Sequence, residues 1–106
     1  MSESPSDVAI ESVWLVEATY APDAAEMRVP FRARHLARLA ELKDAGIVIE
    51  SGAYLDLSSS LMLLRAADEA AALEVARADI YVANGVWIEL RARPFGRVVR
   101  VAAAGS

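Results

Sequence analysis

The chain lacks cysteine altogether and has only one histidine among its 106 residues. The absence of cysteine excludes disulfides, thiolate metal sites and a cysteine nucleophile, so nothing in the sequence requires an oxidising compartment. A single histidine also disfavours a zinc site, because zinc is held mainly by several histidine and cysteine ligands. His35 is therefore the one histidine available for acid–base chemistry near neutral pH.

Long apolar runs are also missing. The longest runs have the length of a strand, and residues 1–7 are polar and acidic without the apolar core of a signal sequence. We therefore expect a cytoplasmic protein with no membrane partner. The net charge of -4 disfavours nucleic acid as a partner, since that binding depends on clustered lysine and arginine. The chain has neither a phosphate-binding glycine loop nor a dinucleotide fingerprint.

Hydrophobic residues are abundant, at 56% of the chain. A chain of this length forms one domain and buries only about two thirds of the surface that its unfolded form exposes. The apolar surplus therefore favours an oligomer, in which further apolar surface is buried.

The hydrophobic pattern predicts one domain over residues 12–101, with disordered ends at 1–11 and 102–106. The predicted strands and helices alternate as βαββαβ: strands at 12–20, 47–54, 61–66 and 86–93, and helices at 30–45 and 68–78. Residues 21–29 and 80–84 are expected to be a loop and a turn. Pro94 is expected to interrupt the last strand, and 97–101 to form a short strand or arm. In the last strand the residues predicted to face inward are Val86, Ile88, Leu90 and Ala92.

This order is typical of an α+β, ferredoxin-like fold, in which both helices cover one face of a four-stranded antiparallel sheet. The strands carry apolar residues on both sides, and two tryptophans are among them. A face left open by the helices would then be apolar. We therefore expect a homodimer that packs two such faces together.

His35 lies in the first helix, on a stripe with Phe31 and Leu39 that should face the sheet. Arg32 and Arg38 lie three residues before and after it, which places both on adjoining helix surface. They are candidates to receive an anionic substrate. The remaining arginines are interpreted as solvated.

Several short motifs occur in a recognisable order: Arg32, His35-Leu36, Leu39, Gly46, Ser51-Gly52, Asp79-Ile80-Tyr81-Val82, Gly85 and Arg93-Pro94-Phe95. Together they resemble the YciI-like (YCII-related) family over residues 13–99. The resemblance implies a ferredoxin-like dimeric α+β barrel with an active site made of His35 and Asp79. Tyr81 lies in one of the matching motifs, and its hydroxyl is a secondary candidate to donate a hydrogen bond to substrate. The chain departs from the family in having Ile80 where proline is common, and Ala53 after Gly52 where proline is also frequent.

Two functions follow as alternatives. A carboxylate bonded to one imidazole nitrogen makes the other nitrogen a better base, so the chain could be a small enzyme without a cofactor. It would move a proton on a small anionic organic substrate, as a lyase, isomerase or dehydrohalogenase does. Alternatively, it is a non-catalytic dimeric module that binds a small molecule or a protein. In that case His35 is a contact to the bound molecule or a pH-sensitive contact. A purely structural interpretation also stays open, in which His35 is a half-buried histidine satisfied by a backbone carbonyl and Asp79 only caps the following turn.

Overall fold

The structure, a computed structural model, describes residues 7–101. The predicted disordered residues 1–6 and 102–106 lie outside the described part. The elements in chain order are β1 (Val8–Tyr20), α1 (Ala24–Met27), α2 (Arg32–Asp44), β2 (Val48–Ala53), β3 (Ser59–Leu64), α3 (Glu69–Arg77), α4 (Ile80–Ala83) and β4 (Trp87–Arg100).

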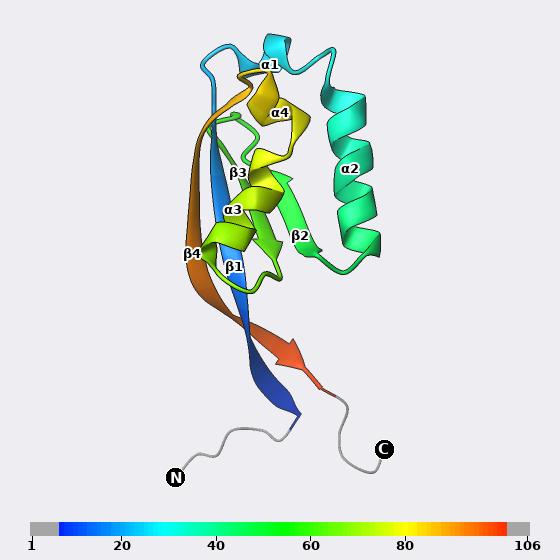
Figure 1. The fold of residues 1–106 in the computed structure, drawn as a ribbon, viewed down its shortest axis with the longest axis vertical. Helices are drawn as coiled ribbons and strands as arrows, with labels where there is room; N and C mark the ends of the chain where they lie inside the picture. Colours follow the sequence, from blue (N-terminus) through cyan, green and yellow to red (C-terminus); the bar gives the residue numbers. More distant parts are fainter. Residues whose placement is uncertain (1–6, 102–106) are drawn as a thin grey trace.

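The four strands form one antiparallel sheet in the order β2-β3-β1-β4. The helices all lie on one face of it, with α2 over β2 and α3 over β1 and β4 (Figure 1). This is the predicted α+β, ferredoxin-like arrangement with a four-stranded antiparallel sheet. Among residues 7–101, no helix is long and apolar enough to cross a bilayer.

The core lies between the helices and the covered face of the sheet. Val16 and Leu64 supply its centre from β1 and β3, and both are fully buried. Helix α3 contributes Ala72 and Ala76, which are fully buried too. Their small side chains let this helix approach the sheet closely, whereas α2 packs through larger residues such as Leu39.

Strands β1 and β4 are longer than predicted. β1 begins at Val8 rather than at residue 12, because its first residues pair with the end of β4, as Ile10 does with Val98. β4 continues through Pro94 instead of stopping there. The strand lies at an edge of the sheet, where a missing N–H is tolerated on the side away from the neighbouring strand. The paired ends extend beyond the helices as a two-stranded arm (Figure 1).

At the start of β4, the prediction of which side chains face the core is wrong: the alternation predicts Ile88 inward and Trp87 outward. Trp87 is buried at 3% exposure, and Ile88 is 59% exposed. The register explains the difference, because Tyr20 pairs with Trp87 and Thr19 with Glu89, which leaves Ile88 as an extra residue in a bulge. From Leu90 onward the inward alternation is as predicted, since Leu90 pairs with the buried Ala18.

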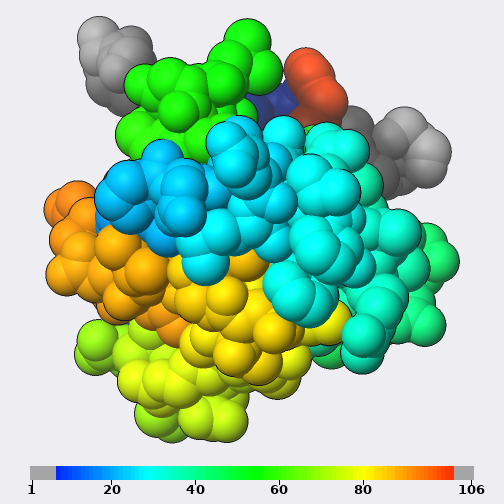
Figure 2. Space-filling view, turned by 90° about the horizontal axis from the view of Figure 1, so that it is seen from above, coloured from blue at the N-terminus to red at the C-terminus, as the bar shows by residue number. Residues whose placement is uncertain are grey.

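The two segments predicted to be loop and turn each contain one turn of helix, α1 and α4. From above, the segment that leads from β1 to α2 lies against α4 at this end of the molecule (Figure 2). A Cβ built on Gly85, just after α4, would lie 3.7 Å from the Met27 side chain of α1. Gly46 ends α2 with a φ of +77°, as its sequence position predicts.

Candidate active site

His35 lies in the first turn of α2 and points toward the sheet. His35 is 5% exposed. Phe31 and Leu39, on the same stripe of the helix, are partly buried and pack against the core. The backbone N–H of His35 donates to the carbonyl of Phe31 over 2.9 Å, which closes the first helical turn. The imidazole is therefore carried by a regular helix rather than by a loop, and its backbone position is well defined.

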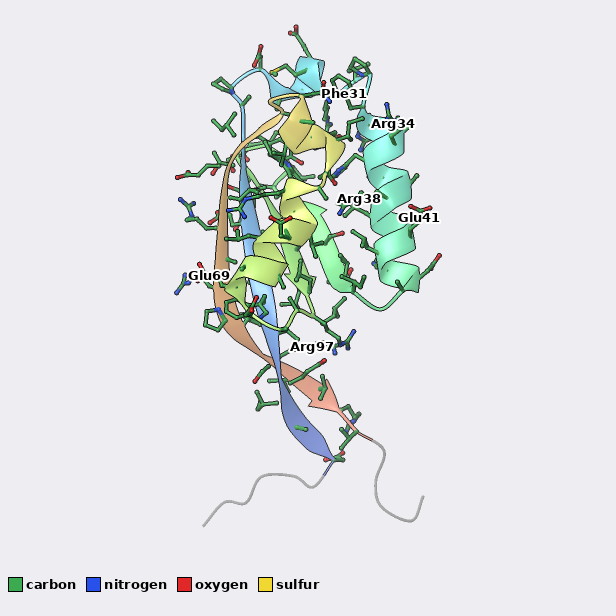
Figure 3. The ribbon with its side chains drawn as sticks, viewed as in Figure 1. Phe31, Arg34, Arg38, Glu41, Glu69 and Arg97 are labelled. Carbon is green, nitrogen blue, oxygen red and sulfur yellow. The ribbon has the colours of Figure 1, made fainter. Side chains whose placement is uncertain are left out.

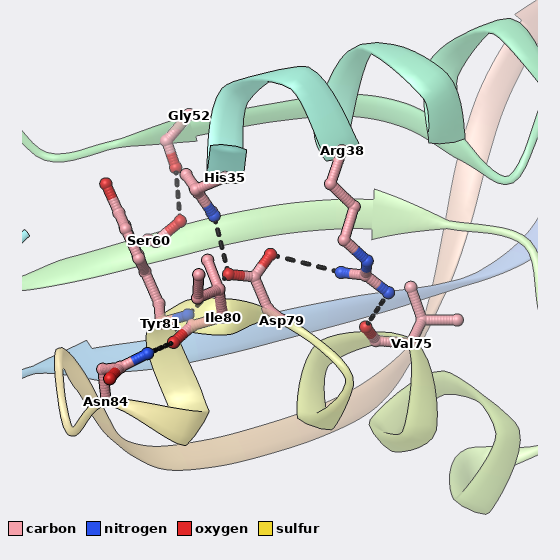
Figure 4. Close-up of polar contacts among 9 residues, drawn as sticks. All are labelled: His35, Arg38, Gly52, Ser60, Val75, Asp79, Ile80, Tyr81 and Asn84. Carbon is pink, nitrogen blue, oxygen red and sulfur yellow. Dashed lines mark hydrogen bonds and ion pairs between the residues drawn. The ribbon is translucent and has the colours of Figure 1, made fainter. Parts of the chain in front are cut away.

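Asp79 lies between α3 and α4 and is 1% exposed. The Nδ1–H of His35 donates to its Oδ1 over 2.8 Å, and the backbone N–H of Tyr81 donates to the same oxygen over 2.9 Å (Figure 4). Asp79 is thus the N-cap of α4 and the partner of His35 at once. The 2.8 Å separation lies within the range expected for a base and the carboxylate that orients it.

The second carboxylate oxygen of Asp79 faces Arg38. Nη1 of Arg38 donates to Asp79 Oδ2 over 3.2 Å, and Nη2 donates to the carbonyl of Val75 in α3 over 2.7 Å. Arg38 extends from α2 toward α3 (Figure 3), and its side chain is a quarter exposed. The guanidinium therefore joins α2 to the end of α3 through the buried carboxylate.

These contacts fix the charge of Asp79. Burial by itself would raise the pKa of its carboxyl group, but hydrogen bonds from His35 and from the Tyr81 backbone, with the positive charge of Arg38, lower the pKa below its ordinary value. Asp79 is therefore ionised at neutral pH and accepts all of its hydrogen bonds. An ionised acceptor at Nδ1 requires a proton on that nitrogen, so the neutral imidazole has its free electron pair on Nε2.

Two aromatic rings contact the imidazole, and a third packs against them. Tyr81 stacks on His35 with the ring centroids 3.8 Å apart and the planes 10° from parallel. Trp87 stands perpendicular to both rings, 5.2 Å from His35 and 5.5 Å from Tyr81. Tyr20 meets Tyr81 edge-on at 6.5 Å. Burial and the neighbouring Tyr20 raise the pKa of the Tyr81 phenol, so the phenol is a neutral hydrogen-bond donor at neutral pH.

A cavity of about 230 Å³ adjoins the imidazole. It lies between α2, α4, the C-terminal end of β2 and the N-terminal end of β3. Its lining combines basic, aromatic and hydroxyl-bearing side chains with a few aliphatic ones: Tyr20, Arg28, Arg32, His35, Leu36, Leu39, Ser51, Gly52, Ala53, Ser60 and Tyr81. The volume suits a small organic molecule. No aspartate or glutamate belongs to this lining.

Comparison with family models now identifies the chain. The model of the YCII-related domain matches residues 13–96. The chain belongs to the YCII-related domain family. The comparison with curated proteins gives no significant match.

Among solved structures, this YCII-related domain is similar to 5-chloro-2-hydroxyhydroquinone dehydrochlorinase from Burkholderia phenoliruptrix AC1100, in complex with 2,5-dihydroxybenzoquinone. The TM-score is 0.68 at 18% sequence identity, over 78% of this chain and 92% of the other. The likeness shows a shared fold.

The structure of the YCII-related domain brings four of the five predicted site residues to the cavity or its wall. His35, Arg32 and Tyr81 line the cavity, and Asp79 lies directly behind His35. Arg38 is placed differently from the prediction, because its guanidinium is bonded to Asp79 and Val75 and does not line the cavity. Its position three residues after His35 turns it toward α3 instead of toward the cavity.

Sequence reasoning did not select several of the lining residues, among them Arg28, Ser60 and Tyr20. Arg28 follows α1 in a segment without helical periodicity, and Ser60 is the second residue of β3, just before the predicted start of that strand at residue 61. Tyr20 ends β1, and its aromatic character alone is equally typical of core. Within residues 7–101 there is no group of three or more histidine, aspartate or glutamate side chains placed to hold a metal ion.

Proposed function

We propose that this YCII-related protein is a small enzyme in which His35 is the general base for a small anionic organic substrate. One observation carries the proposal: Nδ1 of His35 is bonded to the buried, ionised Asp79, while the same ring lines a cavity. A base needs to be oriented on one side and free on the other. A histidine that serves only the core has no need of an adjoining cavity.

The proposed step begins with transfer of a proton from an acidic C–H or O–H of the substrate to Nε2 of His35. The electron pair left behind forms a new double bond in the substrate. In a lyase or dehydrohalogenase it expels a leaving group, and in an isomerase a proton returns at another carbon. Asp79 stabilises the imidazolium that forms. The step needs no oxidant or reductant, so it agrees with an enzyme that uses no cofactor.

The similar solved structure supports the elimination form of this reaction. Its name describes the loss of hydrogen chloride from a chlorinated hydroxyhydroquinone, and its bound molecule is a dihydroxyquinone. For the present chain, the equivalent reaction would act on a keto tautomer of the substrate, in which a ring hydroxyl proton has moved to the chlorine-bearing carbon. A second hydroxyl proton then passes to His35, its electron pair forms a new carbonyl and shifts the ring double bond, chloride leaves, and a hydroxyquinone remains. Tyr81 lines the same cavity and offers its hydroxyl group to a substrate oxygen, whereas the Ser60 hydroxyl donates to the carbonyl of Gly52 and is left as an acceptor.

We also propose that the enzyme is a homodimer. The sheet face away from the helices has an apolar hollow lined in part by Leu15, Leu61 and Leu63. The arm exposes Ile10 at 64% and Val98 at 69%, and these two residues are direct cross-strand partners. A two-stranded ribbon is only marginally stable in water by itself. A second copy of the chain would cover both surfaces.

The test of the catalytic proposal uses chlorinated and unchlorinated probes. Chloride release is measured with 5-chloro-2-hydroxyhydroquinone, and binding is measured calorimetrically with 2,5-dihydroxybenzoquinone. Exchange of ring hydrogens with D₂O is followed by NMR for a panel of hydroxylated aromatic and unsaturated acids. His35→Gln should keep binding but lose turnover or exchange by about 10²-fold or more. Arg34→Gln, an exposed neighbour on α2 outside the cavity lining, is the matched control and should keep both.

Two results would overturn the proposal. His35→Gln with the turnover of the wild type would remove the base. A wild-type protein that gives neither chloride release nor hydrogen exchange with any probe would leave the binding module as the better account.

A further inference from the structure

The charge of the cavity is opposite to that of the chain. The chain carries a formal net charge of -4 with 15 acidic residues, yet none of the acidic residues in the described range 7–101 lines the cavity, and Arg28 and Arg32 both do. Neither arginine forms an ion pair with any carboxylate of residues 7–101. In contrast, Arg38, Arg65 and Arg97 are each paired with an aspartate or glutamate.

The backbone fixes the two arginines relative to each other. Arg28 ends α1, and its carbonyl accepts the N–H of Phe31 over 2.9 Å. Arg32 is the first residue of α2. The short turn between the two helices therefore carries both residues, and both side chains line the cavity. Arg28 is half-buried, a costly position for a cation without an anionic partner.

The surroundings of the phenol of Tyr81 support this placement. The positive charges of Arg28 and Arg32 both act on it and oppose the rise in its pKa that burial causes. Both guanidinium groups are thus close enough to the ring that stacks on His35 to affect its ionisation. A ligand between the arginines and His35 would contact all three groups.

We propose that Arg28 and Arg32 bind a carboxylate group of the substrate, so that the substrate is a carboxylic acid with a second acidic position beside His35. Arginine recognises carboxylates through paired N–H donors in one plane, and both groups here have free donors. Charge balance favours the same class. Arg38 already balances Asp79. The two cavity arginines then match two negative charges on the substrate. One is its carboxylate group, and the other is the charge that develops as a substrate proton moves to His35.

This inference rests on the proposed function for the second charge only, since carboxylate binding does not require catalysis. The test measures dissociation constants for 2,5-dihydroxybenzoate and for 2,5-dihydroxybenzamide, which has nearly the same shape but no charge. The wild type should bind the acid about tenfold or more tightly than the amide, at low salt. The preference should shrink as ionic strength rises, because exposed charge is screened.

Arg28→Gln should abolish the preference for the acid while leaving binding of the amide nearly unchanged. Arg32→Gln should do the same, and this variant replaces an exposed residue whose loss the fold tolerates. Arg34→Gln is the matched control and should keep the preference. Circular dichroism melting curves confirm that each variant is folded.

Equal binding of acid and amide by the wild type would overturn the inference, as would a preference that survives in both the Arg28 and Arg32 variants. Inorganic phosphate that competes as well as the dihydroxybenzoate would contradict the assignment to a carboxylate. These outcomes are independent of the catalytic test. A wild type that binds acid and amide equally but keeps His35-dependent turnover would defeat only the inference, and a wild type that prefers the acid but shows no turnover would defeat only the proposed function.

Discussion

Replacing Asp79 by asparagine removes one charge and keeps the shape of the side chain. Asp79 accepts three hydrogen bonds, from His35, the Tyr81 backbone and Arg38. The asparagine oxygen can replace only one of the two carboxylate oxygens. If it stays with His35 and Tyr81, its amide group faces Nη1 of Arg38, and two donors oppose each other over the 3.2 Å that the ion pair now spans.

The structure sets the size of the effect on stability. A hydrogen bond to a charged group contributes about 1.5–3 kcal/mol, and breaking a fully buried ion pair costs about 3–5 kcal/mol. The Arg38 side chain is a quarter exposed, so solvent screens part of this loss. We expect Asp79→Asn to lower the free energy of unfolding by about 2–3 kcal/mol at neutral pH, measured by urea denaturation.

The effect should depend on pH in one direction. Because the folded state lowers the pKa of Asp79 below its ordinary 3.8, the stabilisation from its ionised form is fully present above that value. It is lost as pH falls through the folded-state pKa. The stability difference between wild type and Asp79→Asn should therefore be larger at about pH 5 than at about pH 2.5.

The same substitution should reduce catalysis. Without the carboxylate charge the imidazolium is less stable, and a charge interaction of about 3–4 kcal/mol at this range corresponds to a fall in kcat of about 10²–10³-fold. A variant with wild-type stability, or with unchanged kcat, would refute the account of the Asp79 contacts.

Three further predictions concern other parts of the molecule. Arg38→Met should lower the free energy of unfolding by about 2 kcal/mol and decrease kcat more than it raises KM, because Arg38 positions Asp79 without touching substrate. The control variant Arg34→Met should change neither stability nor kinetics. Equal stability of the two variants would argue against this role of Arg38. Tyr81→Leu should weaken binding of aromatic probes and lower activity, because the ring that stacks on His35 at 3.8 Å is lost, and kinetics indistinguishable from the wild type would contradict this. Analytical ultracentrifugation at micromolar concentration should show a homodimer, with an interface of about 1,200–2,000 Å² in total, and a stable species of 11.4 kDa would contradict the proposed assembly.

Much of the fold follows from local sequence patterns. The β-forming residues of 12–20, the helical stripe around His35 and the stop at Gly46 each predict the element that the structure has. The errors arise where tertiary contacts override local pattern. The bulge that turns Trp87 inward depends on pairing with Tyr20 at the far end of another strand, and no local period reveals it.

The candidate site was less fully predictable. The family resemblance selects His35 and Asp79, although Ile80 replaces the proline common at the next position. The structure shows why that change is tolerated: the Asp79 carboxylate accepts the Tyr81 N–H and so caps α4 by itself. Helical spacing places Arg38 near His35 but does not tell which side it faces, and Arg28 has no periodic neighbours to mark it.

The most direct measurement of the central claim uses the fact that His35 is the sole histidine, so the imidazole nitrogens give one assignable set of ¹⁵N NMR signals. For the neutral ring, the account predicts a proton on Nδ1, held by Asp79, and an unprotonated Nε2 whose signal shifts when 2,5-dihydroxybenzoate or 2,5-dihydroxybenzoquinone binds in the cavity. The Arg34→Gln control should behave identically. A proton on Nε2, or an Nε2 signal that does not respond to any ligand bound in the cavity, would contradict the claim that His35 is an oriented base facing the substrate.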